Sequence, residues 1–117
     1  MVGDTKSALA SDLRRLVGAQ RVADEESALK AHAGDRWFAS HLPEVVVHAG
    51  STRDVSVVLQ YATAQGIPVT PRGAGVGYVG GCVPLRGGIV LSVAGMRQIK
   101  EIHVEDGVAV VEPGVIT

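Results

Sequence analysis

Hydrophobic residues near the start of the chain recur every three or four positions, as they do on one face of an α-helix. The apolar positions are Leu9, Leu13, Leu16 and Val17, and charged residues fall on the opposite face. We therefore expect an amphipathic helix from Thr5 to about Val17, ended by Gly18. A second, short helix is expected over 24–32, where acidic residues come first and favour a helix N-terminus.

The stretch 34–43 has neither a helical nor a strand period, and we expect it to be a connection. It carries Trp37 and Phe38, two of the few aromatic residues of the chain. Such side chains can anchor a partner or a substrate, but more often they pack against their own domain. We expect Trp37 and Phe38 to pack back onto the domain.

A strand, a helix and a second strand are expected next. The β-branched run 44–48 predicts a strand, and its continuous apolarity predicts burial on both faces. Ser51, followed three positions later by Asp54, is typical of the start of a helix, which should end near Gln65. Together with a strand at 68–70, these elements form a parallel βαβ unit. The apolar stripe of the helix consists of Val55, Val58, Leu59 and Ala62.

Three further strands are expected after a glycine-rich stretch. The apolar run 89–92 indicates a buried strand. The runs 99–104 and 108–111 flank an Asp-Gly pair, which favours a hairpin turn. The order of N-terminal helices, a βαβ unit and a β meander predicts a fold of the α+β class.

Composition and charge narrow the class of protein. The chain has 117 residues, enough for one domain, and its 46% apolar and 20% charged residues are ordinary for a soluble globule. A net charge of −1 without a basic run argues against a nucleic-acid partner. The sequence has no run of about 18 apolar residues and no apolar secretory signal, so we expect a cytoplasmic protein without a membrane span.

The most specialised stretch is Ile67–Gly81, where a short apolar strand runs into a loop with five glycines. Glycine costs about 0.5–1 kcal/mol relative to alanine in regular structure, so this density indicates a use. Glycine lets a ligand approach the backbone without meeting a Cβ, and successive amides in a turn can surround an anion. The pattern predicts a phosphate-binding loop.

Three other interpretations compete with this one. Residues 75–80 have the GxGxxG spacing of a dinucleotide-binding βαβ unit, but Pro84 and two further glycines exclude the helix that such a site requires. The Gly-Lys-Ser/Thr of a nucleoside triphosphate loop is missing. The glycines could also simply form a tight crossover. We therefore expect a phosphate-binding site formed by the backbone of a loop between two strands.

Four ordered motifs resemble those of a known family. Residues 71–92, PRGAGVGYVGGCVPLRGGIVLS, and residues 111–115, VEPGV, resemble the FAD-linked oxidases of the vanillyl-alcohol oxidase/p-cresol methylhydroxylase (PCMH) type. The likeness is to the branch with the glycolate oxidase flavin subunit and D-lactate dehydrogenases, whose pattern is approximately PRGAGTGLSGG, PLxGGIVLS, a methionine a few residues on, and VEPGV. The resemblance implies an N-terminal helical segment at 1–41. It further implies the N-terminal, pyrophosphate-binding part of a PCMH-type FAD-binding domain at 42–117.

The resemblance also implies that the glycine loop wraps the FAD pyrophosphate. The expected cofactor-binding residues are Pro71, Arg72, Gly73, Ala74, Gly75, Val76, Gly77, Tyr78 and Gly81. Arg72 could add positive charge, or it could pair with a carboxylate at the surface. Val76 departs from the family, which usually has threonine there, or histidine in covalent-flavin relatives. Because valine offers neither group, we expect FAD to be bound non-covalently and weakly.

No residue stands out for catalysis or for metal binding. Histidines 32, 41, 48 and 103 have no metal-ligand spacing. The single cysteine, Cys82, is compatible with a reducing compartment. We expect Cys82 to serve as a small apolar residue beside the loop.

Two functions remain open. The first is the FAD-binding part of a flavin-dependent oxidoreductase that oxidises a 2-hydroxy acid such as glycolate or D-lactate. The second is a stand-alone fragment without redox activity, acting as a phosphate-ligand or protein-interaction module. The resemblance implies that the substrate-binding domain lies beyond the VEPG motif. We therefore expect this chain to be the N-terminal part of a longer enzyme, or a shortened form of one, and to be inactive on its own. Its exposed strand faces should associate with a second copy or with the missing C-terminal part.

Overall fold

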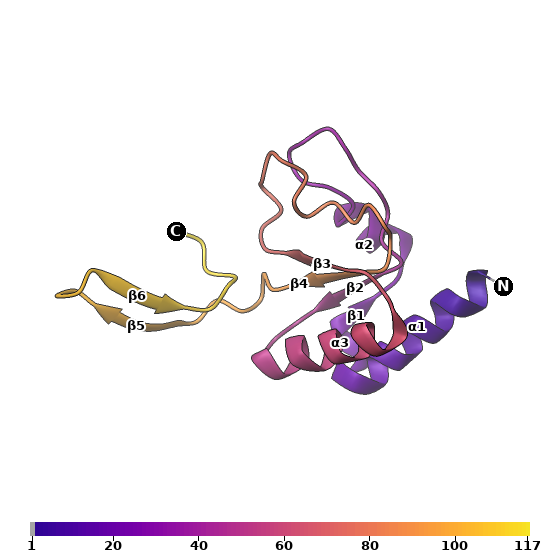
Figure 1. Cartoon of the computed structure of the whole chain (residues 1–117), viewed down its shortest axis with the longest axis horizontal. Helices are drawn as coiled ribbons and strands as arrows, with labels where there is room; N and C mark the ends of the chain where they lie inside the picture. The colour runs from indigo at the N-terminus through magenta and orange to yellow at the C-terminus, as the bar shows by residue number, and fades with distance from the viewer. Residues whose placement is uncertain (1) are drawn as a thin grey trace.

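The computed structural model describes residues 2–117 and confirms a mixed α and β fold (Figure 1). Both long predicted helices and all five predicted strands are present. The elements are α1 (Val2–Val17), a 3₁₀ turn (Ala19–Arg21), β1 (Val22–Ala23), α2 (Glu26–Ala31), β2 (Val45–His48), α3 (Thr52–Gln65), β3 (Val69–Arg72), β4 (Ile89–Ser92), β5 (Ile99–His103) and β6 (Val108–Val111).

Four strands form the main sheet, in the order β1-β2-β4-β3. The strands of the expected βαβ unit, β2 and β3, are parallel as predicted, but β4 lies between them and pairs parallel with both. The expected meander is therefore wrong in one respect. Its first strand belongs to the main sheet, and only β5 and β6 form a separate antiparallel hairpin. The short strand β1, antiparallel to β2, was not predicted.

The Gly87-Gly88 pair explains how β4 enters between its two neighbours. Gly88 has φ 69°, a left-handed conformation that other residues rarely adopt, and a Cβ there would clash with the carbonyl oxygen of Pro68. The Gly88 carbonyl in turn accepts hydrogen bonds from the amides of Glu44 (2.8 Å) and Val45 (3.3 Å). The glycines thus tie the start of β4 to β2 on one side and let it approach β3 on the other.

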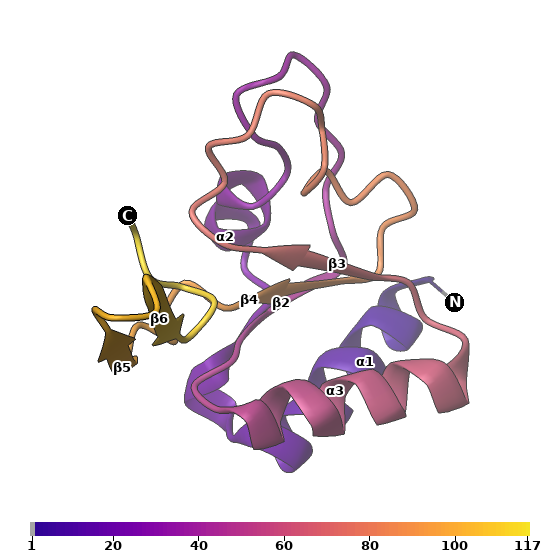
Figure 2. The ribbon, with the colours of Figure 1, turned by 60° about the vertical axis from the view of Figure 1, so that its left-hand side comes forward.

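The sheet is covered on both faces, as the continuous apolarity of β2 predicted (Figure 2). Alternate residues of β2 and β4 point to opposite faces. Val45, Val47, Ile89 and Leu91 pack with α1 and α3 in the larger core cluster, around Leu9, Leu13, Val58 and Ala62. Val46 and Val90 pack with Leu29 of α2 on the other face. The first helix therefore belongs to the same core as the βαβ unit.

Helix α3 has the predicted ends. The Ser51 hydroxyl accepts from the Asp54 amide (3.1 Å), and Gly66 ends the helix in the left-handed conformation, φ 66°. Asp54, only 8% exposed, also accepts from the Gly50 amide (2.9 Å) and pairs with Arg21 (Nε to Oδ2, 3.4 Å). The apolar stripe is narrower than predicted, because Leu59 is exposed.

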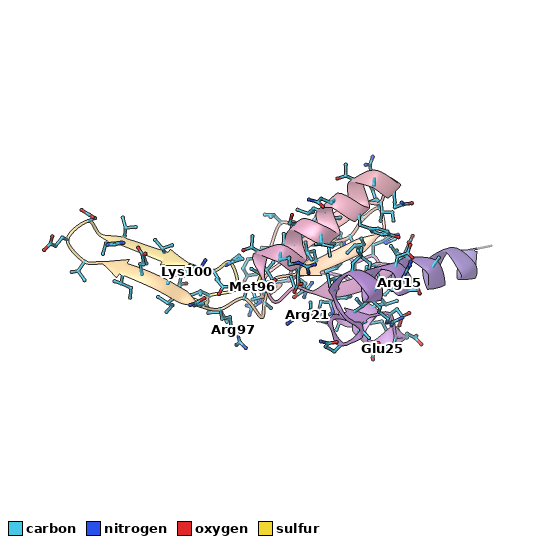
Figure 3. The ribbon with its side chains drawn as sticks, turned by 90° about the horizontal axis from the view of Figure 1, so that it is seen from below. Arg15, Arg21, Glu25, Met96, Arg97 and Lys100 are labelled. Atoms are coloured by element: carbon cyan, nitrogen blue, oxygen red, sulfur yellow. The ribbon has the colours of Figure 1, made fainter. Side chains whose placement is uncertain are left out.

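The β5–β6 hairpin projects from the main body along the 58 Å long axis of the molecule (Figure 1). Met96 is buried where the hairpin begins, and Arg97 and Lys100 lie further out along it (Figure 3). The Gly114 amide donates to the Met96 carbonyl (2.8 Å), which closes the base of the hairpin. Most apolar side chains of the hairpin stay exposed: Ile99, Ile102, Val104, Val108, Val110 and Val111.

Candidate FAD pyrophosphate site

The glycine loop begins at the carboxyl ends of the parallel strands. Arg72, the last residue of β3, is in register with Ser92 of β4, and Ser92 is also in register with His48 of β2. All three strands therefore end at one edge of the sheet, and the loop 73–88 leaves from that edge. Ligands of parallel sheets bind beyond this edge, so the loop is placed where a cofactor would bind.

The loop offers a run of unused backbone donors. The amides of residues 73–79 donate to no other group among the residues that the structure describes. All of these residues are exposed except Gly75, which is half-buried. Nothing lies within 4 Å of the position that a Cβ would take at Gly73 or Gly81. A diphosphate needs several donors and close backbone approach, and this stretch fits both needs.

Gly75 shows why one of these positions must be glycine. Its φ of 71° lies in the left-handed region, and a Cβ there would clash with the Arg72 guanidinium. The loop therefore folds closely over the arginine side chain at its own beginning.

Arg72 does not pair with a carboxylate in the part of the chain that the structure describes, so that alternative is wrong. Its Nη1 donates to the Gly34 carbonyl (2.6 Å) and lies 3.6 Å from the sulfur of Cys82, which is half-buried. Arg72 itself is half-buried beside Gly75. Its positive charge is thus held at the loop without a carboxylate partner among the described residues, which favours an anionic ligand.

The connection 34–38 lies against the loop, an arrangement that the sequence analysis missed. The Arg36 amide donates to the Gly77 carbonyl (2.9 Å), and the Gly80 amide donates to Asp35 Oδ2 (3.0 Å). The Arg36 guanidinium donates to the Tyr78 hydroxyl (3.1 Å). No local sequence pattern predicts these contacts, because they join positions about 40 residues apart.

The expectation that Trp37 and Phe38 pack back onto the domain is wrong for Phe38, which is 86% exposed. Trp37 is 41% exposed, and its ring lies over Gly80 and beside Phe38, with ring centroids 4.4 Å apart. Phe38 stays exposed because its segment follows the exposed loop rather than the sheet, whereas the Trp37 ring packs onto the loop at Gly80.

His48, at the end of β2, is the titratable group of the carboxyl edge whose pKa is shifted. Partial burial lowers the pKa of His48, and the nearby charge of His32 lowers it further, against an opposing effect of Glu25. The His32 and His48 rings meet edge to face at 5.4 Å. The lowered pKa of His48 disfavours its charged form, so this side chain is a poor source of positive charge for a phosphate.

The described residues contain no group of three or more His, Cys, Asp or Glu side chains arranged to hold a metal ion. No described helix is both long and apolar enough to cross a membrane.

The fold and the glycine loop define an anion-binding class of site, and the comparison with known families shows to which family the chain belongs. Residues 43–117, more than half of the chain, match the FAD binding domain family, so the chain belongs to that family. This confirms the resemblance inferred from the sequence motifs and the expectation of FAD as the cofactor.

Individual relatives extend the comparison. The chain is 40% identical over 76 residues to the glycolate oxidase subunit GlcD of Bacillus subtilis, a match covering 65% of this chain and 16% of that protein. It is 36% identical over 95 residues to a D-lactate dehydrogenase of Anaerostipes hadrus, covering 81% of this chain and 20% of that protein.

Among solved structures, the 4-ethylphenol oxidase of Gulosibacter chungangensis superposes with a TM-score of 0.81 at 28% identity, covering 96% of this chain and 23% of the oxidase. A p-cresol methylhydroxylase superposes with a TM-score of 0.80 at 26% identity, covering 98% of this chain and 23% of that chain. The chain thus spans less than a quarter of the length of each of these four proteins.

Proposed function

We propose that this chain is the FAD-binding part of a flavin-dependent oxidoreductase and that its glycine loop holds the diphosphate of FAD. The observation that carries the proposal is the run of unused amides at residues 73–79, at the carboxyl edge of the sheet. Backbone amides are strong donors to phosphate oxygens, and glycine lets those oxygens come close.

The residues named from the sequence take distinct roles in this proposal. The amides of Gly73, Ala74, Gly75, Val76, Gly77 and Tyr78 bind the diphosphate, and Arg72 adds charge from beneath Gly75. Gly81 gives the phosphates room, and Pro71 lies in β3, one residue before the end of the strand that carries the loop. Val76 has no atom that could be linked to a flavin, which supports non-covalent binding. The flavin, when bound, supplies the hydride chemistry.

A 2-hydroxy acid is the substrate class that we propose for the enzyme. The relatives with 40% and 36% identity are a glycolate oxidase subunit and a D-lactate dehydrogenase. The phenol-oxidising enzymes share the fold at lower identity, 28% and 26%. Sequence similarity therefore favours hydroxy acids over phenols.

A second candidate is a stand-alone interaction module without redox activity. The observation that favours it is the exposed apolar hairpin, since contiguous apolar surface marks interaction sites. In this case the loop could still bind a phosphate ligand.

Calorimetric titration of the 117-residue chain with FAD, ADP and riboflavin tests the proposal. We expect FAD and ADP to bind with similar, weak affinity that falls with added salt, because the diphosphate provides the contacts. Riboflavin, which lacks the diphosphate, should not bind. Binding of riboflavin as tight as that of FAD, or no binding of ADP, would show that the loop is not the diphosphate site.

A further inference from the structure

The segment Gly34–Trp37 lies along the glycine loop, and hydrogen bonds join the two at the beginning, the middle and the far end of the loop. Figures 1 and 2 show the two connections side by side beyond the same edge of the sheet. At the beginning of the loop, Arg72 Nη1 donates to the Gly34 carbonyl (2.6 Å). In the middle, the Arg36 amide donates to the Gly77 carbonyl (2.9 Å), and at the far end the Gly80 amide donates to Asp35 Oδ2 (3.0 Å).

These contacts leave the proposed phosphate donors free. They use an arginine side chain, one carbonyl and the amide of Gly80, whereas the amides of 73–79 stay unused within the described chain. The segment can therefore hold the loop in one conformation without competing for its donors. A loop ordered before binding loses less conformational entropy when the ligand arrives.

Asp35 is the centre of this arrangement, because both of its carboxylate oxygens are used. Oδ1 accepts from the Trp37 amide (2.7 Å), and Oδ2 accepts from the Gly80 amide (3.0 Å). Hydrogen bonds to a carboxylate are about twice as strong as those between neutral groups. One half-buried side chain thus joins the backbones of the two segments.

Gly80 fits this contact in a second way. The Trp37 ring lies over it so closely that a Cβ would come within 2.7 Å of ring atom Cε3. The ring and the carboxylate therefore hold the same residue from two directions.

We infer that Gly34–Trp37 is a clamp for the glycine loop, and that Asp35 is a positioning residue for the diphosphate site, acting through Gly80. The inference rests on the proposed function of the loop. Asp35 does not touch the ligand itself, and as an anion near a diphosphate it would by charge alone weaken binding. The clamp and simple electrostatics therefore predict opposite effects when the charge is removed.

The test is Asp35→Asn, which keeps the size of the side chain. Asparagine is neutral and has one acceptor oxygen in place of two, so one of the Trp37 and Gly80 amides would face an NH₂ group and the other would lose the charge that strengthens its hydrogen bond. We expect hydrogen exchange of the Gly80 amide to become about tenfold faster, and ADP to bind about tenfold more weakly, while the midpoint of thermal unfolding is unchanged. Gly80→Ala should weaken ADP binding in the same direction.

Asp24→Asn is the matched control. It removes the same charge from an aspartate that pairs with Arg14 (2.9 Å), on a different part of the molecule. Neither Gly80 exchange nor ADP affinity should change in this variant. Tighter ADP binding in Asp35→Asn, or ADP affinity equal to that of the wild type, would overturn the inference.

The outcome separates this inference from the proposed function. If the wild-type chain does not bind ADP, the proposed function fails, and Gly80 exchange alone decides whether the clamp exists. Faster exchange in Asp35→Asn but not in Asp24→Asn would support the clamp, and equal exchange in all three proteins would refute it.

Discussion

Val76 lies within the run of unused amides, and its side chain is 53% exposed. It is therefore accessible to a ligand that binds at the loop. A valine there gives apolar contact but no donor for a phosphate oxygen. At the scale of single residues, this position should limit the affinity of the loop, because the backbone around it is already suited to an anion.

Replacing Val76 by threonine should strengthen binding. A hydrogen bond to a charged group contributes about 1.5–3 kcal/mol, so ADP and FAD should bind roughly tenfold to a hundredfold more tightly to Val76→Thr. Calorimetric titration measures the change. Val104→Thr, at a position 84% exposed on the hairpin, is the control and should leave affinity unaltered. Equal affinities in wild type and Val76→Thr would mean that the side chain does not reach the phosphates.

Predictions at the residue scale succeeded where the cause was local. The caps of α3 follow from Ser51 and Gly66, because each acts on its own helix end. The surroundings of Arg72 could not be predicted. Its partner is the backbone carbonyl of Gly34, 38 positions away, and because every residue has such a carbonyl, the sequence does not reveal which one is used. The exposure of Phe38 was also missed, because it depends on the position of its segment along the glycine loop, which is distant in sequence.

At the scale of elements, α1 and α3 are joined by a polar contact as well as by the core. The Tyr61 hydroxyl donates to Asp12 Oδ2 (2.8 Å). Burial raises the pKa of Tyr61 to about 12, and the hydrogen bond and the negative charge of Asp12 add to this. The folded pKa lies above the unfolded value of about 10, so this contact stabilises the fold below pH 10 and the contribution is lost as the pH rises toward 12.

Titration of the tyrosine absorbance checks this prediction. Tyr78→Phe leaves Tyr61 as the only tyrosine, and its ionisation should have a midpoint near pH 12. Asp12→Asn in the same background should lower that midpoint, because it removes the negative charge. A midpoint near 10 while the protein is still folded would contradict the described contact.

Element order was predictable, but strand order was not. The boundaries of β2, α3, β4 and the hairpin follow from apolar periods and from turn residues. The position of β4 between β2 and β3 depends on Gly88 meeting Pro68 and Glu44, contacts between three separate stretches of sequence. The strand β1 has only two residues, too few for a period.

At the scale of the whole molecule, the projecting hairpin is the feature that bears on association with other chains. Ile102 lies opposite Ala109, and Ile99 lies opposite Val111, so these four side chains share one face of the hairpin. All four are exposed. An apolar face and two unpaired strand edges favour association with another sheet.

We predict that the isolated chain associates with itself through this hairpin. Sedimentation at tens of micromolar should show a dimer or a larger species, and Ile102→Lys should shift it toward monomer. Lys100→Glu, a charge change on the same strand, is the control and should have a smaller effect. A stable wild-type monomer would show that the hairpin is not a self-association surface.

The central claim, that the glycine loop binds the diphosphate of FAD, is tested most directly by titrating the ¹⁵N-labelled chain with ADP. ADP carries the diphosphate without the flavin ring. We predict chemical-shift changes concentrated at the amides of 73–79 and weakened by salt, with the hairpin amides unaffected. Changes confined to other residues, or no changes at millimolar ADP, would contradict the account.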